Sequence, residues 1–296
     1  MKVIFLGCGY LGYNLSEALK NKQEVEVWGL DSPYASLSTC FRNVDVFNLD
    51  ELSKYDLNDA IIVDTVSLVS NSATSDNDDL YLEKLKNKYN ELFNYLKTRN
   101  INSYYFISSG GTVYGETNIP IKENHELLAK TLYAKSKVML EECLKESGLN
   151  YVILRLSNPY GGFQVTDKKQ GVIPILIEKI LKNEEFELWG ESNTVRDYIY
   201  IDDLGQLFNK LIDHKIHNET INVGSGVGHS LKEVFDLVEK NTNKKINVKH
   251  VPSDVPIVKS IILDITKLLD LTKIDINTTL DEGIKKEVKR IQEELK

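Results

Sequence analysis

The sequence is poor in cysteine, and it lacks both long apolar runs and an excess of positive charge. Its three cysteines are scattered and form no CxxC pair, which excludes a disulfide framework and favours a reducing, cytoplasmic location. No apolar run reaches the ~18 residues that a membrane span needs, and the apolar start breaks at glycines too early for a signal peptide. The net charge of −8 argues against nucleic acid or an anionic membrane surface as a partner.

The composition that remains is that of an ordinary globular protein. The chain has 296 residues, of which 42% are hydrophobic and 27% are charged. This length suits one large α/β unit or two small domains, and it allows a sizeable core without disulfides. The five histidines show no ligand spacing, so no metal site is predicted.

Strand-like and helical runs alternate through the first two thirds of the chain. The strand-like runs are "KVIFL", "VEVWGL", "AIIVDTV", "YYFIS" and "YVILRL", and the helical runs are residues 11–21, 80–98, 132–147 and 173–183. This alternation predicts an α/β protein with a doubly wound parallel sheet covered by helices on both faces. After Asn158 the pattern loosens. There "RDYIYIDDL" and "ETINVGSG" read as further strands, and capping boxes at Ser230 and Thr279 predict two helices.

A glycine-rich turn, "GCGYLG", follows the first strand and opens a helix. Gly7, Gly9 and Gly12 form a G-x-G-x-x-G, with Tyr10 and Leu11 between the last two glycines. Glycines at these positions allow a tight turn and the close approach of a pyrophosphate to the helix N-terminus. A glycine-rich strand–helix turn without a ligand is the plainer interpretation, but the position of the motif favours dinucleotide binding.

A carboxylate stands at the end of the second strand. Asp31 lies nineteen positions after Gly12, where an acidic side chain accepts hydrogen bonds from both adenosine ribose hydroxyls. A 2′-phosphate would be repelled by Asp31, and no arginine follows immediately. NAD is therefore predicted rather than NADP.

The segment "YAKSK" places Tyr133 and Lys137 four residues apart, on one face of a helix. A phenol has a pKa of about 10, and a neighbouring ammonium together with a cationic nicotinamide would favour the phenolate. A tyrosine in that setting can exchange a proton with a substrate hydroxyl. The same spacing also arises by chance in a chain with 15 tyrosines, so only its position in a dinucleotide-binding pattern supports catalysis.

Taken together, these motifs resemble the extended short-chain dehydrogenases, the sugar-nucleotide epimerase/dehydratase family. The motifs "GCGYLG", "SSGGTVYG", "YAKSK", "RLSNPYG", "GVIP", "VRDYIYIDDL" and "NVGSG" occur in the order of that family and cover nearly the whole chain. The resemblance implies a Rossmann domain formed by residues 1–157 and 198–224. It implies a smaller, partly interleaved nucleotide-sugar-binding domain formed by residues 158–197 and 225–296.

The resemblance assigns the strand end "SSGGTVYG" to the nicotinamide and the sugar. Ser108 is expected at the cofactor, and Ser109 and Gly110 at the substrate. The family usually has a serine or threonine at position 110, where it contacts the reacting hydroxyl, and this chain has glycine. Thr112 is the expected substitute, although it could equally bond its own turn. If space remains, a serine at position 110 should be tolerated.

Further substrate contacts are implied by the resemblance. Asn158, Gly171, Val172 and Arg196 are expected to bind the nucleotide sugar, Arg196 through the diphosphate. An Asn-Pro turn at Asn158, and an ion pair of Arg196 with Asp197 or Asp202, remain as structural alternatives. Ser253 and Asp254 occupy the segment where such epimerases usually have an arginine for the diphosphate.

Three functions stay open from the sequence. The first is an NAD-dependent 4-epimerase of a nucleotide-diphosphate sugar, of the UDP-hexose type, in a polysaccharide pathway. The second is a 4-keto-sugar reductase, which would consume external NAD(P)H. The third is a non-catalytic nucleotide-binding homologue, favoured only by Gly110 and the missing arginine. A homodimer through the helices at 80–98 and 132–147 is implied by the resemblance.

Overall fold

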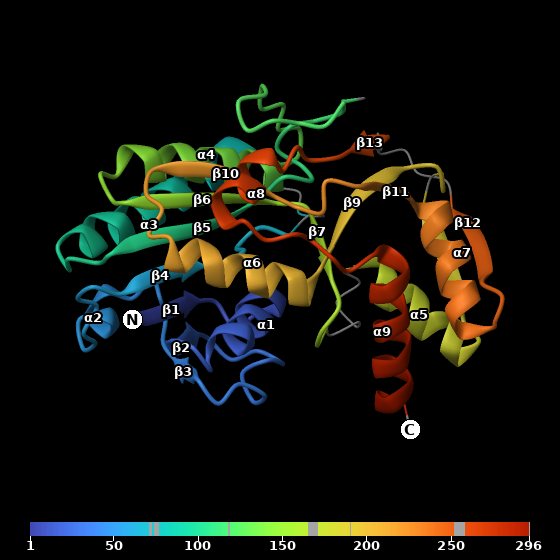
Figure 1. Cartoon of the computed structure of the whole chain (residues 1–296). Helices are drawn as coiled ribbons and strands as arrows, with labels where there is room; N and C mark the ends of the chain where they lie inside the picture. The colour runs from blue at the N-terminus through green and yellow to red at the C-terminus, as the bar shows by residue number, and fades with distance from the viewer. Residues whose placement is uncertain are drawn as a thin grey trace.

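The computed structural model describes residues 1–70, 73, 77–117, 119–164, 171–189, 191–251 and 258–295. Its largest feature is a seven-stranded sheet in which all neighbouring strands are parallel. The strands are β1 (Lys2–Leu6), β2 (Glu24–Gly29), β3 (Phe41–Asn43), β4 (Ile61–Asp64), β5 (Ser103–Ser109), β6 (Tyr151–Leu156) and β10 (Glu219–Val223). Their order is β3-β2-β1-β4-β5-β6-β10 (Figure 1). The order reverses between β1 and β4, and ligands of such sheets bind at the carboxyl ends beside this reversal.

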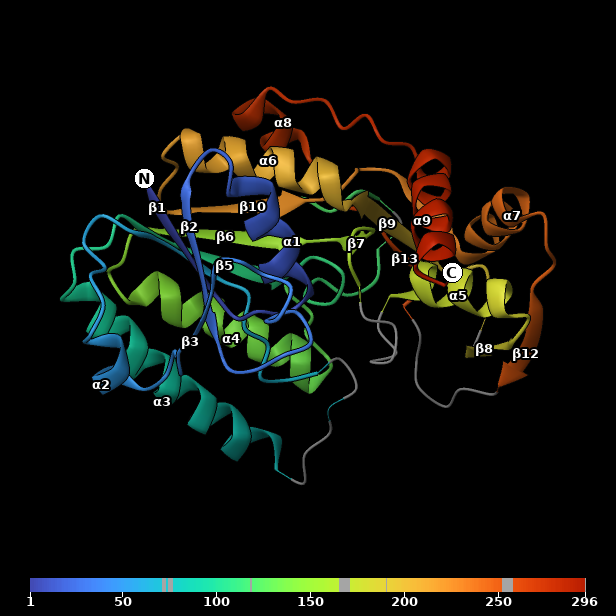
Figure 2. The same ribbon diagram turned by 90° about the horizontal axis from the view of Figure 1, so that it is seen from below.

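Helices cover both faces of this sheet, as Figure 2 shows. One face carries α1 (Tyr10–Leu19), α6 (Ile201–Asp213) and α8 (Thr266–Thr272). The other face carries α3 (Asp78–Lys97) and α4 (Leu132–Glu146), and the short α2 (Leu49–Leu52) follows β3. Each face buries its own apolar cluster, so the strands read as continuous apolar runs. The predicted doubly wound parallel sheet is confirmed.

A second, smaller group of elements lies beside the carboxyl ends of the sheet, at the right of Figure 1. Its strands are β7 (Asn158–Tyr160), β9 (Val195–Tyr200), β11 (Gly228–Ser230) and β13 (Ser260–Ile261), with β9 bonded to the other three, and a separate parallel pair, β8 (Glu185–Trp189) and β12 (Asn247–Val251). Three helices, α5 (Val172–Lys182), α7 (Leu231–Thr242) and α9 (Leu280–Glu294), share one apolar core with β7, β8, β9 and β12. Both predicted capping boxes, at Ser230 and Thr279, are present.

The sequence prediction of one strand through "RDYIYIDDL" is wrong in its second half. β9 ends at Tyr200, and α6 begins at Ile201. The helical period explains the change, because Ile201, Leu204 and Leu207 are all buried on the face toward the sheet. Two aspartates in the first turn also favour a helix start. Within the described ranges, no helix is both long and apolar enough to cross a membrane.

Candidate active site

The glycine turn between β1 and α1 is built for close backbone packing. Gly7 has φ +94°, a conformation that side chains disfavour, and a Cβ on Gly12 would lie 2.0 Å from the carbonyl oxygen of Gly7. A Cβ on Gly9 would meet nothing within 4 Å, so the turn is open on that side. Gly9 caps α1 without a side-chain hydrogen bond, which leaves the first backbone N–H groups available to an anion.

The side chains around this turn hold it against the neighbouring strands. Thr65, just after β4, donates its hydroxyl to the carbonyl oxygens of Leu6 and Gly7, both at 2.9 Å. Tyr10 donates its hydroxyl to the carbonyl oxygen of Gly161 at 2.9 Å, which ties the start of α1 to the segment after β7. Asp31 lies two residues after the end of β2, and it is exposed. The turn and Asp31 therefore fit the pyrophosphate and the ribose of a dinucleotide.

Three hydroxyl groups meet at the carboxyl end of β5. Thr112 donates its hydroxyl to Ser109 Oγ at 2.9 Å, and the Ser109 hydroxyl is hydrogen-bonded to the phenol of Tyr133 at the start of α4. Burial raises the pKa of Tyr133, and the hydrogen bond from Ser109 opposes that rise. The structure thus brings both candidate hydroxyls to Tyr133, with Ser109 in direct contact and Thr112 behind it.

Lys137 lies one helical turn after Tyr133 and is buried, with 6% of its surface exposed. Its ammonium donates to the carbonyl oxygen of Ile107 at 2.9 Å and lies 5.8 Å from the centre of the Tyr133 ring. Burial lowers the pKa of Lys137, whereas the charges of Asp64 and Glu141 raise it. The helical spacing therefore places Tyr133 and Lys137 together, as the sequence predicts.

The space at Gly110 is filled by the protein itself. A Cβ at this position would lie 2.7 Å from Leu263 Cδ1 and 2.9 Å from the carbonyl oxygen of Arg155. A serine was expected to be tolerated here only if space remained, and that condition is not met, because its Cβ would point into a packed cluster. A Cβ on Gly111 would be 3.9 Å from its nearest neighbour, the amide of Asn158, which is ordinary contact.

We expect Gly110→Ser to lower the free energy of unfolding by ~1–3 kcal/mol, the usual cost of overpacking a filled core. Gly111→Ser is the matched control, because the adjacent position has room for a Cβ. Urea unfolding of both variants measures the difference. Equal stability of the two serine variants would contradict the steric argument.

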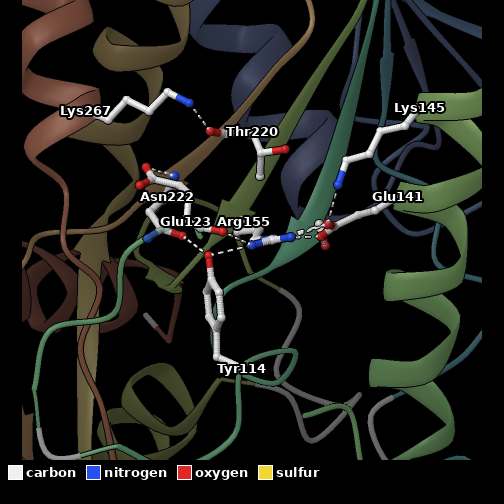
Figure 3. A network of polar contacts seen from close by, with 9 residues as sticks. Tyr114, Glu123, Glu141, Lys145, Arg155, Thr220, Asn222 and Lys267 are labelled. Carbon is white, nitrogen blue, oxygen red and sulfur yellow. Dashed lines mark hydrogen bonds and ion pairs between the residues drawn. The ribbon is translucent and has the colours of Figure 1, made fainter. Parts of the chain in front are cut away.

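A buried polar network lies under the same strand end (Figure 3). Ser108 donates its hydroxyl to Glu141 Oε1 at 2.5 Å, and Arg155 Nη2 donates to Glu141 Oε2 at 2.6 Å. Arg155 also donates to the hydroxyl of Tyr114 at 2.9 Å, which in turn donates to Asn222 Oδ1 at 2.6 Å. Because its hydroxyl donates to Glu141, the Ser108 side chain connects the end of β5 to this network.

Sequence reasoning did not find Asp64, Glu141 or Arg155. One signal was available, since Tyr133, Lys137 and Glu141 follow one another at intervals of four and so share one face of α4. The other two stand in apolar strand runs, "IIVD" and "YVILRL", where a charged residue is unusual.

The expected substrate residues lie in the smaller group of elements, on β7, β9 and the start of α5. Asn158 Nδ2 donates to the carbonyl oxygen of Asp197 at 2.9 Å, while Gly171 and Val172 begin α5. The Arg196 guanidinium donates to the carbonyl oxygen of Val195 at 2.8 Å, and burial lowers its pKa. The Arg196 side chain is therefore half-buried.

Neither carboxylate that was considered as a structural partner binds Arg196. Asp197 accepts hydrogen bonds from Ser225 and from the backbone of the neighbouring segments, and Asp202 lies 3.8 Å from Lys286. The structural alternative for Arg196 is therefore wrong. Ser253 and Asp254 lie outside the described residues, and within the described ranges no cluster of three or more His, Cys, Asp or Glu side chains could hold a metal.

Comparison with known proteins agrees with these features. Residues 4–224 match the NAD dependent epimerase/dehydratase family. The chain belongs to this family. NAD is the cofactor that the description of the family names, so the prediction of NAD from the glycine turn and Asp31 is confirmed at that level. The resemblance drawn from the sequence motifs is likewise confirmed.

Members of the family with different activities are similar to this chain. It is 39% identical over 191 residues to the dTDP-4-dehydro-6-deoxyglucose reductase of Escherichia coli, covering 63% of this chain and 60% of that protein. It is 38% identical over 149 residues to a Methanocaldococcus jannaschii protein assigned as a UDP-glucose 4-epimerase, covering 49% and 48%. The match therefore spans less than two thirds of either relative. The Thermotoga maritima UDP-glucose 4-epimerase superposes over 100% of both chains with TM-score 0.89 at 24% identity, which supports the fold.

Proposed function

We propose that this protein is an NAD-dependent epimerase of a nucleotide-diphosphate sugar, of the UDP-hexose 4-epimerase type. The observation that carries the proposal is the row of hydroxyls from Thr112 through Ser109 to Tyr133, beside the buried Lys137. A sugar hydroxyl placed at this row meets one group that can take its proton and a second that can share its hydrogen bond. The similarity to family members named as UDP-glucose 4-epimerases supports the proposal.

In the proposed reaction, Tyr133 takes the proton of the sugar 4-hydroxyl and later returns it. Ser109, held by Thr112, donates a hydrogen bond to the Tyr133 oxygen and so stabilises its deprotonated form. Lys137 places a positive charge behind the phenol. The chemistry supplied by a bound NAD is reversible hydride transfer at the carbon that carries this hydroxyl. Arg196, half-buried and without an ion pair to Asp197 or Asp202, is proposed to bind the diphosphate.

One experiment tests the proposal directly. The purified protein is denatured and the supernatant is assayed for NAD, and the native protein is incubated with UDP-glucose and UDP-galactose while NMR follows the sugar signals. We expect about one NAD per chain and interconversion of the two sugars without added cofactor, because an epimerase restores its cofactor in each turnover. Absence of both results would contradict the proposal.

The second candidate is a 4-keto-sugar reductase, which the 39% identity to the Escherichia coli reductase favours. A reductase consumes one NAD(P)H for each turnover, so added cofactor is oxidised in proportion to product. Stoichiometric oxidation of NADPH with a 4-keto nucleotide sugar, together with a cofactor-free purified protein, would establish the reductase and exclude the epimerase.

Cofactor choice gives a separate prediction. Asp31→Ala should narrow the difference in affinity between NAD and NADP, because the carboxylate pairs with ribose hydroxyls and repels a 2′-phosphate. Calorimetric titration of both cofactors into the cofactor-free protein measures the effect. Asp213→Ala, at an exposed aspartate at the end of α6, is the matched control and should leave the ratio unchanged. Equal affinity of the wild-type protein for NAD and NADP would show that Asp31 has no such role.

The remaining features that the resemblance implies complete the proposal. Residues 1–157 and 198–224 would bind NAD, and residues 158–197 and 225–296 would bind the nucleotide sugar. The chain would form a homodimer through α3 and α4 and act in the cytoplasm on a polysaccharide precursor. The free state of Cys8, Cys40 and Cys143 fits a reducing compartment. Light scattering of the purified protein measures its mass in solution.

A further inference from the structure

A buried carboxylate, Asp64, lies at the end of β4, next to the catalytic strand. Only 1% of its surface is exposed. In the pairing of β4 with β5, Asp64 is the partner of Phe106, so the two side chains are neighbours on the same face of the sheet. That face is covered by α3 and α4. The proposed mechanism does not use Asp64.

The hydrogen bonds of Asp64 favour its ionised form. Its carboxylate accepts from the backbone N–H of Val66 at 2.8 Å, from the hydroxyl of Tyr104 at 2.8 Å and from the hydroxyl of Tyr89. All three donors are neutral, and hydrogen bonds of this kind favour the charged form of a carboxyl group. Burial opposes them and raises the pKa of Asp64. A carboxylate held in this way needs a positive charge nearby.

Lys137 is placed to supply that charge. Its ammonium lies 4.7 Å from the centre of the Phe106 ring, the cross-strand neighbour of Asp64. Glu141, the other buried carboxylate beside Lys137, is already paired with Arg155 through three contacts of 2.6–3.2 Å. Asp64 forms no ion pair within the described part of the chain. Asp64 and Lys137 are therefore two buried groups that form no ion pair in the described part of the chain, and both lie beside Phe106.

We propose that Asp64 is the counter-charge of Lys137 and keeps the ammonium protonated behind Tyr133, which makes Asp64 a positioning residue for the proton transfer. This inference rests on the proposed function, in which Tyr133 is the acid and base. Asp64 acts through Lys137 and does not touch the substrate hydroxyl.

The electrostatic balance at Lys137 supports this role. Burial lowers the pKa of Lys137, and of the two charges that raise it Asp64 has the larger effect and Glu141 the smaller. The titratable and charged groups around Lys137 are Asp64 on β4, Tyr104 on β5, Arg155 on β6, Tyr89 on α3, and Tyr133 and Glu141 on α4. Without the Asp64 charge, only Glu141 would raise the pKa of Lys137 against the effect of burial. Lys137 should then release its proton at lower pH.

The first test uses Asp64→Asn, which keeps the shape and can still accept from the Val66 N–H. The measurement is the pH dependence of turnover with UDP-galactose. We expect the alkaline limb of the profile to move to lower pH by about one unit, because Lys137 loses its proton earlier. Tyr104→Phe removes one hydrogen bond to Asp64 but leaves its charge, so its alkaline limb should coincide with that of the wild type. Superposed limbs for the wild type and Asp64→Asn would overturn the proposal, as would equal shifts in both variants.

The second test does not depend on turnover, so it separates this inference from the proposed function. Asp64→Asn, Lys137→Met and the double variant are unfolded in urea at pH 7, each in the purified full-length protein. We expect the double variant to lose less stability than the sum of the two single losses, because each single change leaves a buried charge without its partner. Additive losses would show that the two charges are independent and would overturn the pairing. An inactive wild type with coupled losses would refute only the proposed function.

Discussion

Tyr133→Phe is expected to lower the turnover of UDP-galactose by ~10²–10⁴-fold, the usual contribution of general acid–base catalysis. The phenol is the one ionisable group in the hydroxyl row formed by Thr112, Ser109 and Tyr133. The ring itself remains in the variant, so its packing is kept. The loss should therefore fall on turnover, with cofactor content and the urea midpoint close to those of the wild type.

The neighbouring hydroxyls provide the controls for this prediction. Thr112→Val should cost less than Tyr133→Phe, because Thr112 reaches the phenol only through Ser109. The loss of turnover in Ser109→Ala should lie between these two, since this variant removes the hydrogen bond that lowers the pKa of Tyr133 against the effect of burial. Turnover of Tyr133→Phe close to the wild-type value would refute the assigned acid and base. If Thr112→Val were as damaging as Tyr133→Phe, the hydroxyl absent at Gly110 would be supplied by Thr112.

Glu141→Gln is expected to lower the free energy of unfolding by ~3–5 kcal/mol, the cost of leaving one member of a buried ion pair without its partner. Glu141 and Arg155, which are paired in Figure 3, are 1% and 3% exposed. The carboxylate also accepts the hydroxyl of Ser108. The amide of glutamine cannot balance the buried guanidinium. Urea unfolding monitored by circular dichroism measures the loss.

Two further variants decide whether the charge or the packing is responsible. Replacement of both members, Glu141→Leu with Arg155→Met, should recover part of the loss, because no buried charge is then left alone. Lys145 is 38% exposed, and its Nζ lies 3.9 Å from Glu141 Oε2. Lys145→Ala should therefore change the free energy of unfolding by less than ~1 kcal/mol. A loss of similar size in Lys145→Ala and Glu141→Gln would contradict the argument.

Much of the fold could be predicted from the sequence, because its signals are local. The strand "YVILRL" is β6 residue for residue, and the capping boxes at Ser230 and Thr279 begin helices at the predicted places. The prediction of one strand through "RDYIYIDDL" is wrong because the β-branched and aromatic pattern of β9 extends only as far as Ile201, the first residue of α6. There the burial of every third or fourth residue against the sheet determines a helix.

For the site, sequence spacing alone established the glycine turn and the pair Tyr133 and Lys137, since both depend on residues within a single turn or helix. What surrounds them depends on strands that are distant in the chain. Gly110 has no room for a side chain because Leu263 packs on it, and no local pattern carries that contact. Asp64, Lys137 and Arg155 lie on three different elements, and only the parallel pairing of β4, β5 and β6 under α4 brings their charges together. The sequence determined which groups can carry the chemistry, and the tertiary structure decided which charges are buried beside them.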